Sequence, residues 1–181
     1  MKILLTPDPA LRQVAQEIKK FDKKLEAQIK DMIKALKSAT DPEGVGLAAP
    51  QVGINKRFFL LNVHNRIQVF INPKVIKQSE AMLSDVYKKK KDRFLEGCLS
   101  LPGIWGFVDR PYWTELEYQT PLDSKLATKI HRFEGIESSY ALHELDHLDG
   151  ILFTDRILEQ KGVIFRETKK GLEPIALIDS I

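Results

Sequence analysis

Two histidines four residues apart, His143 and His147, constrain this chain of 181 residues more than any other feature of its sequence. On an α-helix, residues four apart lie one turn apart on the same side, so both imidazoles can reach one metal ion. Glu144 lies about 100 degrees round the helix from His143, where a carboxylate can act as a base without being a ligand. Asp149 and Gly150 are expected to end the helix, because glycine tolerates left-handed geometry.

The alternative is that the two histidines are ordinary core residues. Burying two imidazoles beside a carboxylate without a metal would leave polar atoms unpaired, at about 1–3 kcal/mol for each. Metal binding removes that penalty, so the pattern favours a metal site.

A catalytic site of this kind usually has three protein ligands and one position left for water. A histidine six residues after His147 would indicate a metzincin, but Phe153 stands there. Cys98 is the only cysteine, which excludes an intramolecular disulfide, and its neighbouring glycine and turn favour a thiolate ligand over an inert core thiol. The other candidates for the third ligand are His64, His131, Glu167 and Glu173.

Hydrophobic periodicity predicts an amphipathic surface helix over 21–37, broken at 41–44, and a buried helix over 136–148 that is apolar on both sides. The order of elements predicts one domain, 1–181, of α+β class, with antiparallel β-sheets folded around a central buried helix that carries the two histidines. A short helix is predicted over 10–18. Strands are predicted at 3–5, 57–63, 67–71, 74–77, 94–103 (ending in a turn), 105–108, 112–118, 126–133, 162–167 and 172–178.

Three local features carry further expectations. The small residues of 44–53 form either a tight loop or a cleft wall, along which substrate backbone passes close to the amide of Gln51. The lysine-rich segment 79–93 is a solvated loop or flap, with partner binding as the alternative. Asp146, on a buried helix, needs a partner for its charge, and Arg110 is the candidate.

Composition excludes several classes of protein. No apolar run approaches the ~20 residues of a membrane span, and the first residues do not form a signal sequence. A formal charge of +3 is too small to argue for nucleic-acid binding. We therefore expect a cytoplasmic protein that binds neither membrane nor nucleic acid specifically.

The chain resembles a peptide deformylase in three blocks that follow that family's order. A lone His-Glu-x-x-His is moderately specific, but the three blocks together are highly specific. The resemblance extends from Pro7 to about Phe153. The blocks are Gly44-Val45-Gly46-Leu47-Ala48-Ala49-Pro50-Gln51, Glu96-Gly97-Cys98-Leu99-Ser100 and His143-Glu144-Leu145-Asp146-His147.

The resemblance implies one divalent metal ion held by Cys98, His143 and His147, with iron(II) expected first and zinc, nickel or cobalt as substitutes. It implies that Glu144 is the general acid and base, and that the substrate carbonyl is bound by Gln51 and by the backbone N–H of Leu99. The implied reaction removes the formyl group from formyl-methionyl nascent peptides and releases formate, with the ribosome as a transient partner.

Substrate contacts are implied at Gly44, Val45 and Gly46, and in a methionine pocket at Ile136, Ser139 and Tyr140. The chain departs from the family's pattern at three positions. Leu142 replaces a usual glutamine, Trp105 replaces a usual arginine that helps to hold the peptide, and Tyr140 stands where the pocket is usually apolar. Two alternatives stay open, namely the same chemistry on a different N-acyl amine, and a metal-binding protein without turnover.

Overall fold

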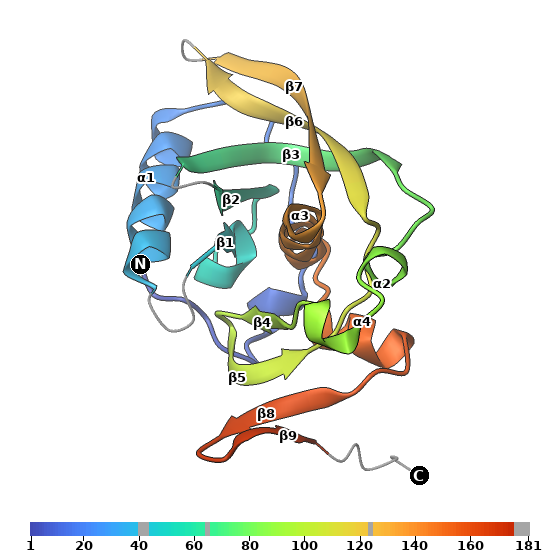
Figure 1. Cartoon of the computed structure of the whole chain (residues 1–181). Helices are drawn as coiled ribbons and strands as arrows, with labels where there is room; N and C mark the ends of the chain where they lie inside the picture. Colours follow the sequence, from blue (N-terminus) through green and yellow to red (C-terminus); the bar gives the residue numbers. More distant parts are fainter. Residues whose placement is uncertain (40–43, 64–65, 123–124, 176–181) are drawn as a thin grey trace.

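The computed structural model describes residues 1–39, 44–63, 66–122 and 125–175, and its strands form two antiparallel sheets. Helices and sheets together give an α+β fold, so the predicted class is confirmed. Figure 1 shows helix α3 (Ile136–Leu148) near the middle of the molecule, between the larger sheet and the short strands of the smaller one. The two sheets therefore enclose the helix that carries both histidines.

The larger sheet has five strands in the order β1-β2-β3-β6-β7, each antiparallel to its neighbour. The predicted strands 67–71 and 74–77 are two halves of one long strand, β3, whose pairing with β6 is interrupted by register shifts. The bounds are Gly46–Ala48 for β1, Phe58–Val63 for β2, Arg66–Gln78 for β3, Trp113–Leu122 for β6 and Lys125–Glu134 for β7.

The smaller sheet has the order β4-β5-β8-β9 and pairs two segments that are far apart in the sequence. Strand β4 (Glu96–Cys98) ends at the cysteine, and β5 (Leu101–Gly106) returns beside it. The predicted tail strands form the hairpin of β8 (Ile164–Thr168) and β9 (Gly171–Pro174), which is attached to β5 and lies at the lower edge in Figure 1.

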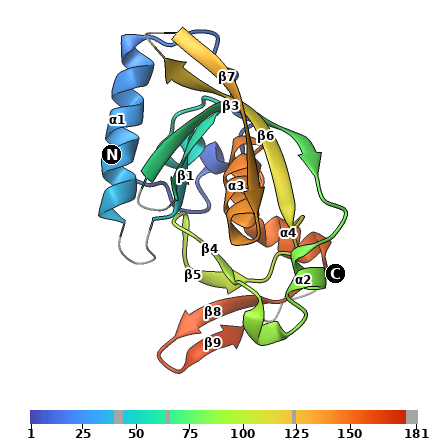
Figure 2. The same cartoon turned by 45° about the horizontal axis from the view of Figure 1, so that its top comes forward.

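Helix α1 (Lys23–Ser38) confirms the predicted amphipathic helix. The Asp22 side chain caps its first turn by accepting from the N–H of Leu25 at 2.8 Å. Its buried stripe packs in one core cluster with β1 and β2, and Figure 2 shows the helix along one side of the larger sheet. The stripe consists of Leu25, Ile29, Met32, Ala35 and Leu36.

Helix α3 has the bounds that the sequence predicts, and ten of its thirteen residues are buried. Gly135 precedes it with a φ of 58°, and Gly150 follows it with a φ of 71°. At Gly150 a side chain would also lie 2.6 Å from the carbonyl oxygen of Arg12, so two independent constraints require glycine there. The predicted left-handed end of the helix is confirmed.

Several local predictions are wrong. Residues 3–5 form no strand, and instead of a helix over 10–18 there is one 3₁₀ turn, η1 (Pro9–Arg12). The prolines explain this turn, because Pro9 starts it and the Asp8 side chain accepts from the N–H of Ala10 at 2.9 Å. The segment 79–93 is not entirely a loop, since it contains α2 (Leu83–Val86) and η3 (Lys90–Asp92).

Helix α4 (Phe153–Glu159) was not predicted. It has only seven residues, too few to show a clear helical period. A further 3₁₀ turn, η2 (Ala49–Val52), follows β1. The predicted features at 41–43, His64 and 176–178 lie outside the described residues. No helix in the described part of the chain is both long and apolar enough to cross a membrane.

Candidate metal centre

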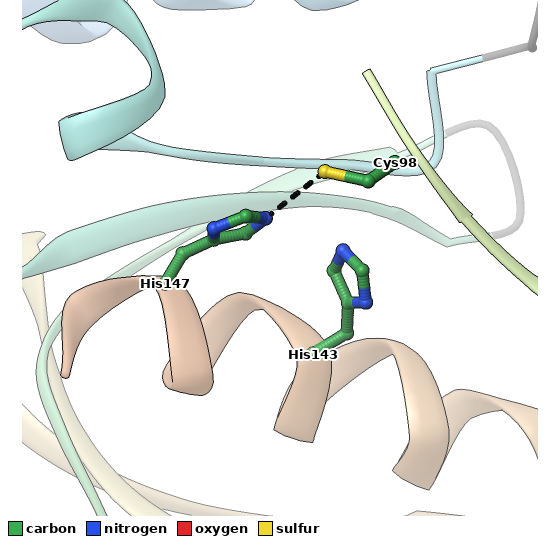
Figure 3. A group of neighbouring side chains, drawn as sticks. All are labelled: Cys98, His143 and His147. Atoms are coloured by element: carbon green, nitrogen blue, oxygen red, sulfur yellow. Dashed lines mark hydrogen bonds between the residues drawn. The ribbon is translucent and has the colours of Figure 1, made fainter. Parts of the chain in front are cut away.

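Three potential metal ligands converge between α3 and the end of β4. One ligand atom from each of Cys98, His143 and His147 lies within 4.8 Å of the other two, and all three residues are buried. The Sγ of Cys98 lies 3.2 Å from Nε2 of His147. Figure 3 shows the thiol facing both imidazoles, which project from successive turns of the helix. The i, i+4 spacing thus has the effect that the sequence predicts.

The strand pairing of β4 and β5 places Cys98 in this group. Gly97 pairs with Trp105, but Cys98 pairs with Leu101, so the register shifts between these two positions and the chain turns sharply after the cysteine. The backbone N–H of Ser100 then points at the Sγ, 3.4 Å away. A donated hydrogen bond stabilises a thiolate, the form of cysteine that binds metals.

The other candidates for the third ligand lie elsewhere. His131 is on β7, where its ring packs edge-on against Phe133. Glu167 accepts a hydrogen bond from Trp105, and Glu173 is exposed on β9. His64 is outside the described residues, among which Cys98 completes the only group of three close potential ligands with the two histidines.

Glu96 fixes the orientation of His143. Its Oε2 lies 2.9 Å from Nδ1 of His143, which leaves Nε2 directed toward the thiol and the second imidazole. Arg110 donates to both oxygens of Glu96, at 2.6 and 3.0 Å, and Ser139 donates to Oε1 at 2.7 Å. The carboxylate that holds the imidazole is therefore itself held from three directions.

Burial and the neighbouring charges shift the pKa values of Glu96 and His147. Burial acts to raise the pKa of Glu96, but the Arg110 charge and the His143 hydrogen bond outweigh it and hold the pKa well below its ordinary value. Burial lowers the pKa of His147 well below its ordinary value, and the charge of His143 acts in the same direction. His147 is thereby kept neutral, as metal binding requires.

Asp146 lies on the opposite side of Arg110 from Glu96. Arg110 donates to its Oδ2 at 2.8 Å, and Arg156 of α4 approaches its Oδ1 to 2.7 Å. Asp146 is 7% exposed, so the predicted partnership with Arg110 is confirmed. A continuous chain of charged groups runs from His143 through Glu96, Arg110 and Asp146 to the unpredicted helix α4.

Glu144 lines the same cleft as Cys98 and His143, and it is buried. Burial raises its pKa to about 7, although the nearby His143 charge opposes this. One of its oxygens, Oε2, has no hydrogen-bond partner among the described residues. Such an atom normally has a water or an ion close to it. Gly46 of β1 contacts the other oxygen so closely that an added Cβ would lie 2.2 Å from Oε1.

These observations test whether a metal ion fits. One sulfur and two imidazole nitrogens are the donors that iron(II), zinc, cobalt and nickel accept. The Nδ1 of His143 contacts Glu96, so Nε2 is the nitrogen left to bind a metal, as in most metal-binding histidines. Glu144, whose Oε2 has no partner among the described residues, lines the same cleft as Cys98 and His143. The residues fit a single divalent ion.

Gln51 of the turn η2 also lines the cleft, where backbone and side-chain contacts hold its amide. The N–H of Ala48 donates to Oε1 of Gln51 at 2.8 Å, which turns the amide nitrogen toward Cys98 and Ser100 at 3.5 and 3.2 Å. Gln51 is 2% exposed. The cleft-wall interpretation of 44–53 thus applies to Val45, Gly46 and Gln51, which line the cleft together with Leu99.

An open cleft with about 800 Å³ of empty space, part of it continuous with solvent, leads to the group. Its walls include Tyr140 of α3 and Trp105 of β5, two of the positions where the chain departs from the family pattern. Gly44 packs on the end of α1, since a Cβ there would meet the carbonyl oxygen of Leu36 at 2.6 Å. The cleft is lined by Val45, Gly46, Gln51, Leu95, Glu96, Gly97, Cys98, Leu99, Trp105, Tyr140, His143 and Glu144.

Of the three predicted pocket residues, Tyr140 lines this cleft. Ser139 donates to Glu96, and the substrate contacts expected of Ser139 and Ile136 stay predictions. Leu142 belongs to the apolar core cluster. Sequence reasoning also gave no role to Glu96. Its position two residues before Cys98 on the same strand was a usable signal, because such residues share a face.

Comparison with known proteins agrees with this geometry. The family model for polypeptide deformylase matches residues 1–162. The peptide deformylase of Natranaerobius thermophilus is 35% identical over 167 residues, covering 92% of this chain and 95% of that protein. The peptide deformylase of Treponema pallidum is 36% identical over 161 residues, covering 89% of this chain and 90% of that protein.

Solved structures agree as well. The crystal structure of peptide deformylase from Thermotoga maritima superposes with a TM-score of 0.73 at 34% identity, covering 86% of this chain and 95% of that one. A peptide deformylase from Synechococcus elongatus, in complex with actinonin, gives 0.74 at 33% identity, covering 86% and 78%. Since the family model matches most of the chain and these relatives share about 35% identity over most of their length, the chain belongs to the polypeptide deformylase family of enzymes.

Proposed function

We propose that this protein hydrolyses the N-terminal formyl group of formyl-methionyl nascent peptides and releases formate. The observation that carries the proposal is the convergence of Cys98, His143 and His147 within 4.8 Å, at the end of a cleft that Glu144 and Gln51 also line. Membership of the polypeptide deformylase family supports the choice of the formyl amide among N-acyl amines.

The three side chains would hold one divalent ion through Sγ of Cys98 and an imidazole nitrogen of each histidine. We propose iron(II) as the native metal from the family resemblance, and zinc, nickel and cobalt suit the same donors. When bound, such an ion supplies Lewis-acid chemistry, lowering the pKa of water and polarising a carbonyl.

The chain's own residues would carry out the proton transfers. Glu144 accepts a proton as water attacks the formyl carbon, and its burial, which raises the pKa of its carboxyl, favours uptake of that proton. The negative charge that develops on the formyl oxygen is stabilised by donation from Gln51 Nε2 and from the Leu99 N–H. Glu144 then gives the proton to the departing amine as the C–N bond breaks, leaving formate and a free amino terminus.

The arrangement of the cleft supports a peptide substrate. Val45 and Gly46 line the wall on the β1 side, and Tyr140 lines the wall on the α3 side. We propose that the first side chain of the peptide lies against Tyr140 and that residues 1–181 act as one catalytic domain. Because formylated chains emerge from ribosomes, the proposed location is the cytoplasm, with transient contact to the ribosome.

The test is formate release from formyl-Met-Ala-Ser by protein prepared without oxygen, with bound metal measured on the same sample. Acetyl-Met-Ala-Ser is the matched control, since it differs by one methyl group. We expect turnover of the formyl peptide and at least about 100-fold less of the acetyl peptide. Preference for the acetyl peptide would indicate the other N-acyl substrate class, and no turnover of either by metal-loaded protein would indicate metal binding alone.

A further inference from the structure

We propose that Trp105 and Glu167 form a subsite that selects formylated peptides with a cationic side chain after the first residue. The proposal rests on the proposed function for its substrate, and it goes beyond that function by assigning a sequence preference. Neither residue belongs to the metal group or to the proton-transfer machinery.

The indole of Trp105 lies across two neighbouring strands. Trp105 pairs directly with Gly97 of β4 on one side and with Phe165 of β8 on the other. A Cβ at Gly97 would meet Cζ3 and Cε3 of the ring at 2.7 and 2.8 Å, so the six-membered ring covers that glycine. The absence of a side chain at Gly97 therefore lets the ring lie close to β4, one residue before Cys98.

Glu167 fixes the other end of the ring. Residues two apart on a strand share a face, so Glu167 lies on the same face of β8 as Phe165. Its Oε2 accepts from Nε1 of Trp105 at 3.2 Å. The indole is thus held at both ends, on β4 by packing and on β8 by a hydrogen bond, and it forms part of the cleft wall.

The electrostatics of this wall favour a positive side chain. No lysine or arginine lines the cleft in the described part of the chain, whereas Glu167 places an exposed carboxylate against the indole. The face of an indole attracts cations, and the carboxylate adds to that attraction. Trp113 shows the same chemistry within this protein, because the guanidinium carbon of Arg132 lies 4.0 Å from its ring centroid.

Trp105 stands where the family pattern usually has an arginine, so this position adds no positive charge to the cleft wall. A tryptophan beside a carboxylate attracts a cationic side chain. The hairpin carries Arg166 one residue before Glu167, but neighbouring residues on a strand face opposite sides, and Arg166 lies opposite Glu173 of β9. Lys169 and Lys170 lie at the turn beyond Thr168, while Glu167 contacts the indole itself. The predicted substrates carry lysine or arginine at the second or third position.

Two measurements test the subsite. The first compares kcat/KM for formyl-Met-Lys-Ala, formyl-Met-norleucine-Ala and formyl-Met-Glu-Ala. A second set of three peptides carries the same three residues at the third position, after formyl-Met-Ala. We expect a preference of about fivefold for lysine over norleucine at one of the two positions, and a larger preference for lysine over glutamate. Glu167→Gln, which keeps an acceptor for the indole but removes the charge, should reduce the lysine preference, and Trp105→Leu should abolish it.

Glu173→Gln is the matched control, since Glu173 is an exposed glutamate on the same hairpin and should leave every ratio unchanged. The second measurement needs no turnover. The chain has two tryptophans, so Trp113→Phe leaves Trp105 as the only one. In this variant, the product peptide Met-Lys-Ala should change the Trp105 fluorescence at a lower peptide concentration than Met-Glu-Ala does.

The two readouts separate the proposals. If no formyl peptide is hydrolysed but the fluorescence titration still prefers the lysine peptide, the proposed function fails and the subsite stands. Equal kcat/KM for lysine, norleucine and glutamate at both positions would overturn the subsite. The same conclusion would follow if saturating peptide left the Trp105 fluorescence unchanged.

Discussion

Gly46 and Glu144 are in such close contact that no side chain fits between them, since a Cβ on Gly46 would lie 2.2 Å from Oε1 of the glutamate. Gly46→Ala should therefore push the carboxylate away from its position. A displacement of about 1 Å in a reacting group can cost about 100-fold, so kcat/KM for formyl-Met peptides should fall by about that factor while the metal content stays constant.

Gly44→Ala provides the control for this substitution. The added methyl group would meet the carbonyl oxygen of Leu36 instead of Glu144. It should lower the free energy of unfolding with little effect on turnover per folded molecule. If Gly46→Ala retained full activity, the assignment of Glu144 as the proton-transfer group would lose its support.

Glu96 and Asp146 allow the effect of a buried charge on stability to be distinguished from its effect on metal binding. Both carboxylates pair with buried Arg110, but only Glu96 contacts His143. Removing one partner of a buried ion pair costs about 3–5 kcal/mol, so Glu96→Gln and Asp146→Asn should both lower the free energy of unfolding measured in urea.

Only Glu96→Gln should also weaken metal binding, by about 10- to 100-fold in competition with a chelator. The reason is that Glu96, unlike Asp146, contacts the metal-binding imidazole of His143. Equal loss of metal affinity in the two variants would show that Glu96 acts through general stability and has no specific effect on His143.

Glu96 also makes a prediction about pH. Burial raises its pKa, but Arg110 and His143 outweigh burial and hold it well below the ordinary value of 4.5. A group with a depressed pKa contributes its stabilisation fully above its unfolded value and loses it as the pH falls through the folded value. The free energy of unfolding of the metal-free protein should therefore decline as the pH falls below about 4.5.

The Glu96→Gln variant isolates this contribution from those of the other acids. Its stability should be lower at neutral pH and should change less between about pH 6 and pH 3. Parallel pH profiles for the two proteins would rule out a depressed pKa at this carboxyl.

Tyr140 is predicted to limit the size of the first side chain of the substrate. It lines the cleft on the α3 side, and burial raises the pKa of its hydroxyl, so the phenol stays neutral at physiological pH. Tyr140→Ala should raise kcat/KM for formyl-Phe relative to formyl-Met peptides by about tenfold, because it enlarges the pocket.

Tyr140→Phe keeps the ring and removes only the hydroxyl, so it should leave that ratio close to that of the unchanged protein. A ratio unaffected by Tyr140→Ala would place the first side chain elsewhere in the cleft.

The sequence predicted those parts of the site that depend on local spacing. Hydrophobic periodicity indicated the helix and its bounds, and the interval between His143 and His147 indicated the shared direction of the two imidazoles. The chemistry of a single thiol indicated Cys98, and the need to neutralise a buried charge indicated that Asp146 pairs with Arg110. Each of these inferences uses only helix geometry or the cost of an unpaired group.

The parts that were missed depend on how strands pair. The role of Glu96 follows from the β4–β5 pairing, and the position of the Trp105 ring depends on the absence of a side chain at Gly97. Gly44 packs on the end of α1, and its expected contact with the substrate stays a prediction. Helix α4 is stabilised mainly by burial of Phe153 and Ile157 in the cluster around Cys98, a tertiary effect with little trace in local sequence.

The central claim, that Cys98, His143 and His147 hold the ion on which turnover depends, is tested most directly by titrating metal-free protein with cobalt(II) or iron(II). Formate release should rise linearly and stop rising at one ion per chain, and cobalt(II) should give a thiolate absorption band that Cys98→Ala abolishes together with activity. Full turnover by metal-free protein, or unchanged metal binding and activity in Cys98→Ala, would contradict the claim.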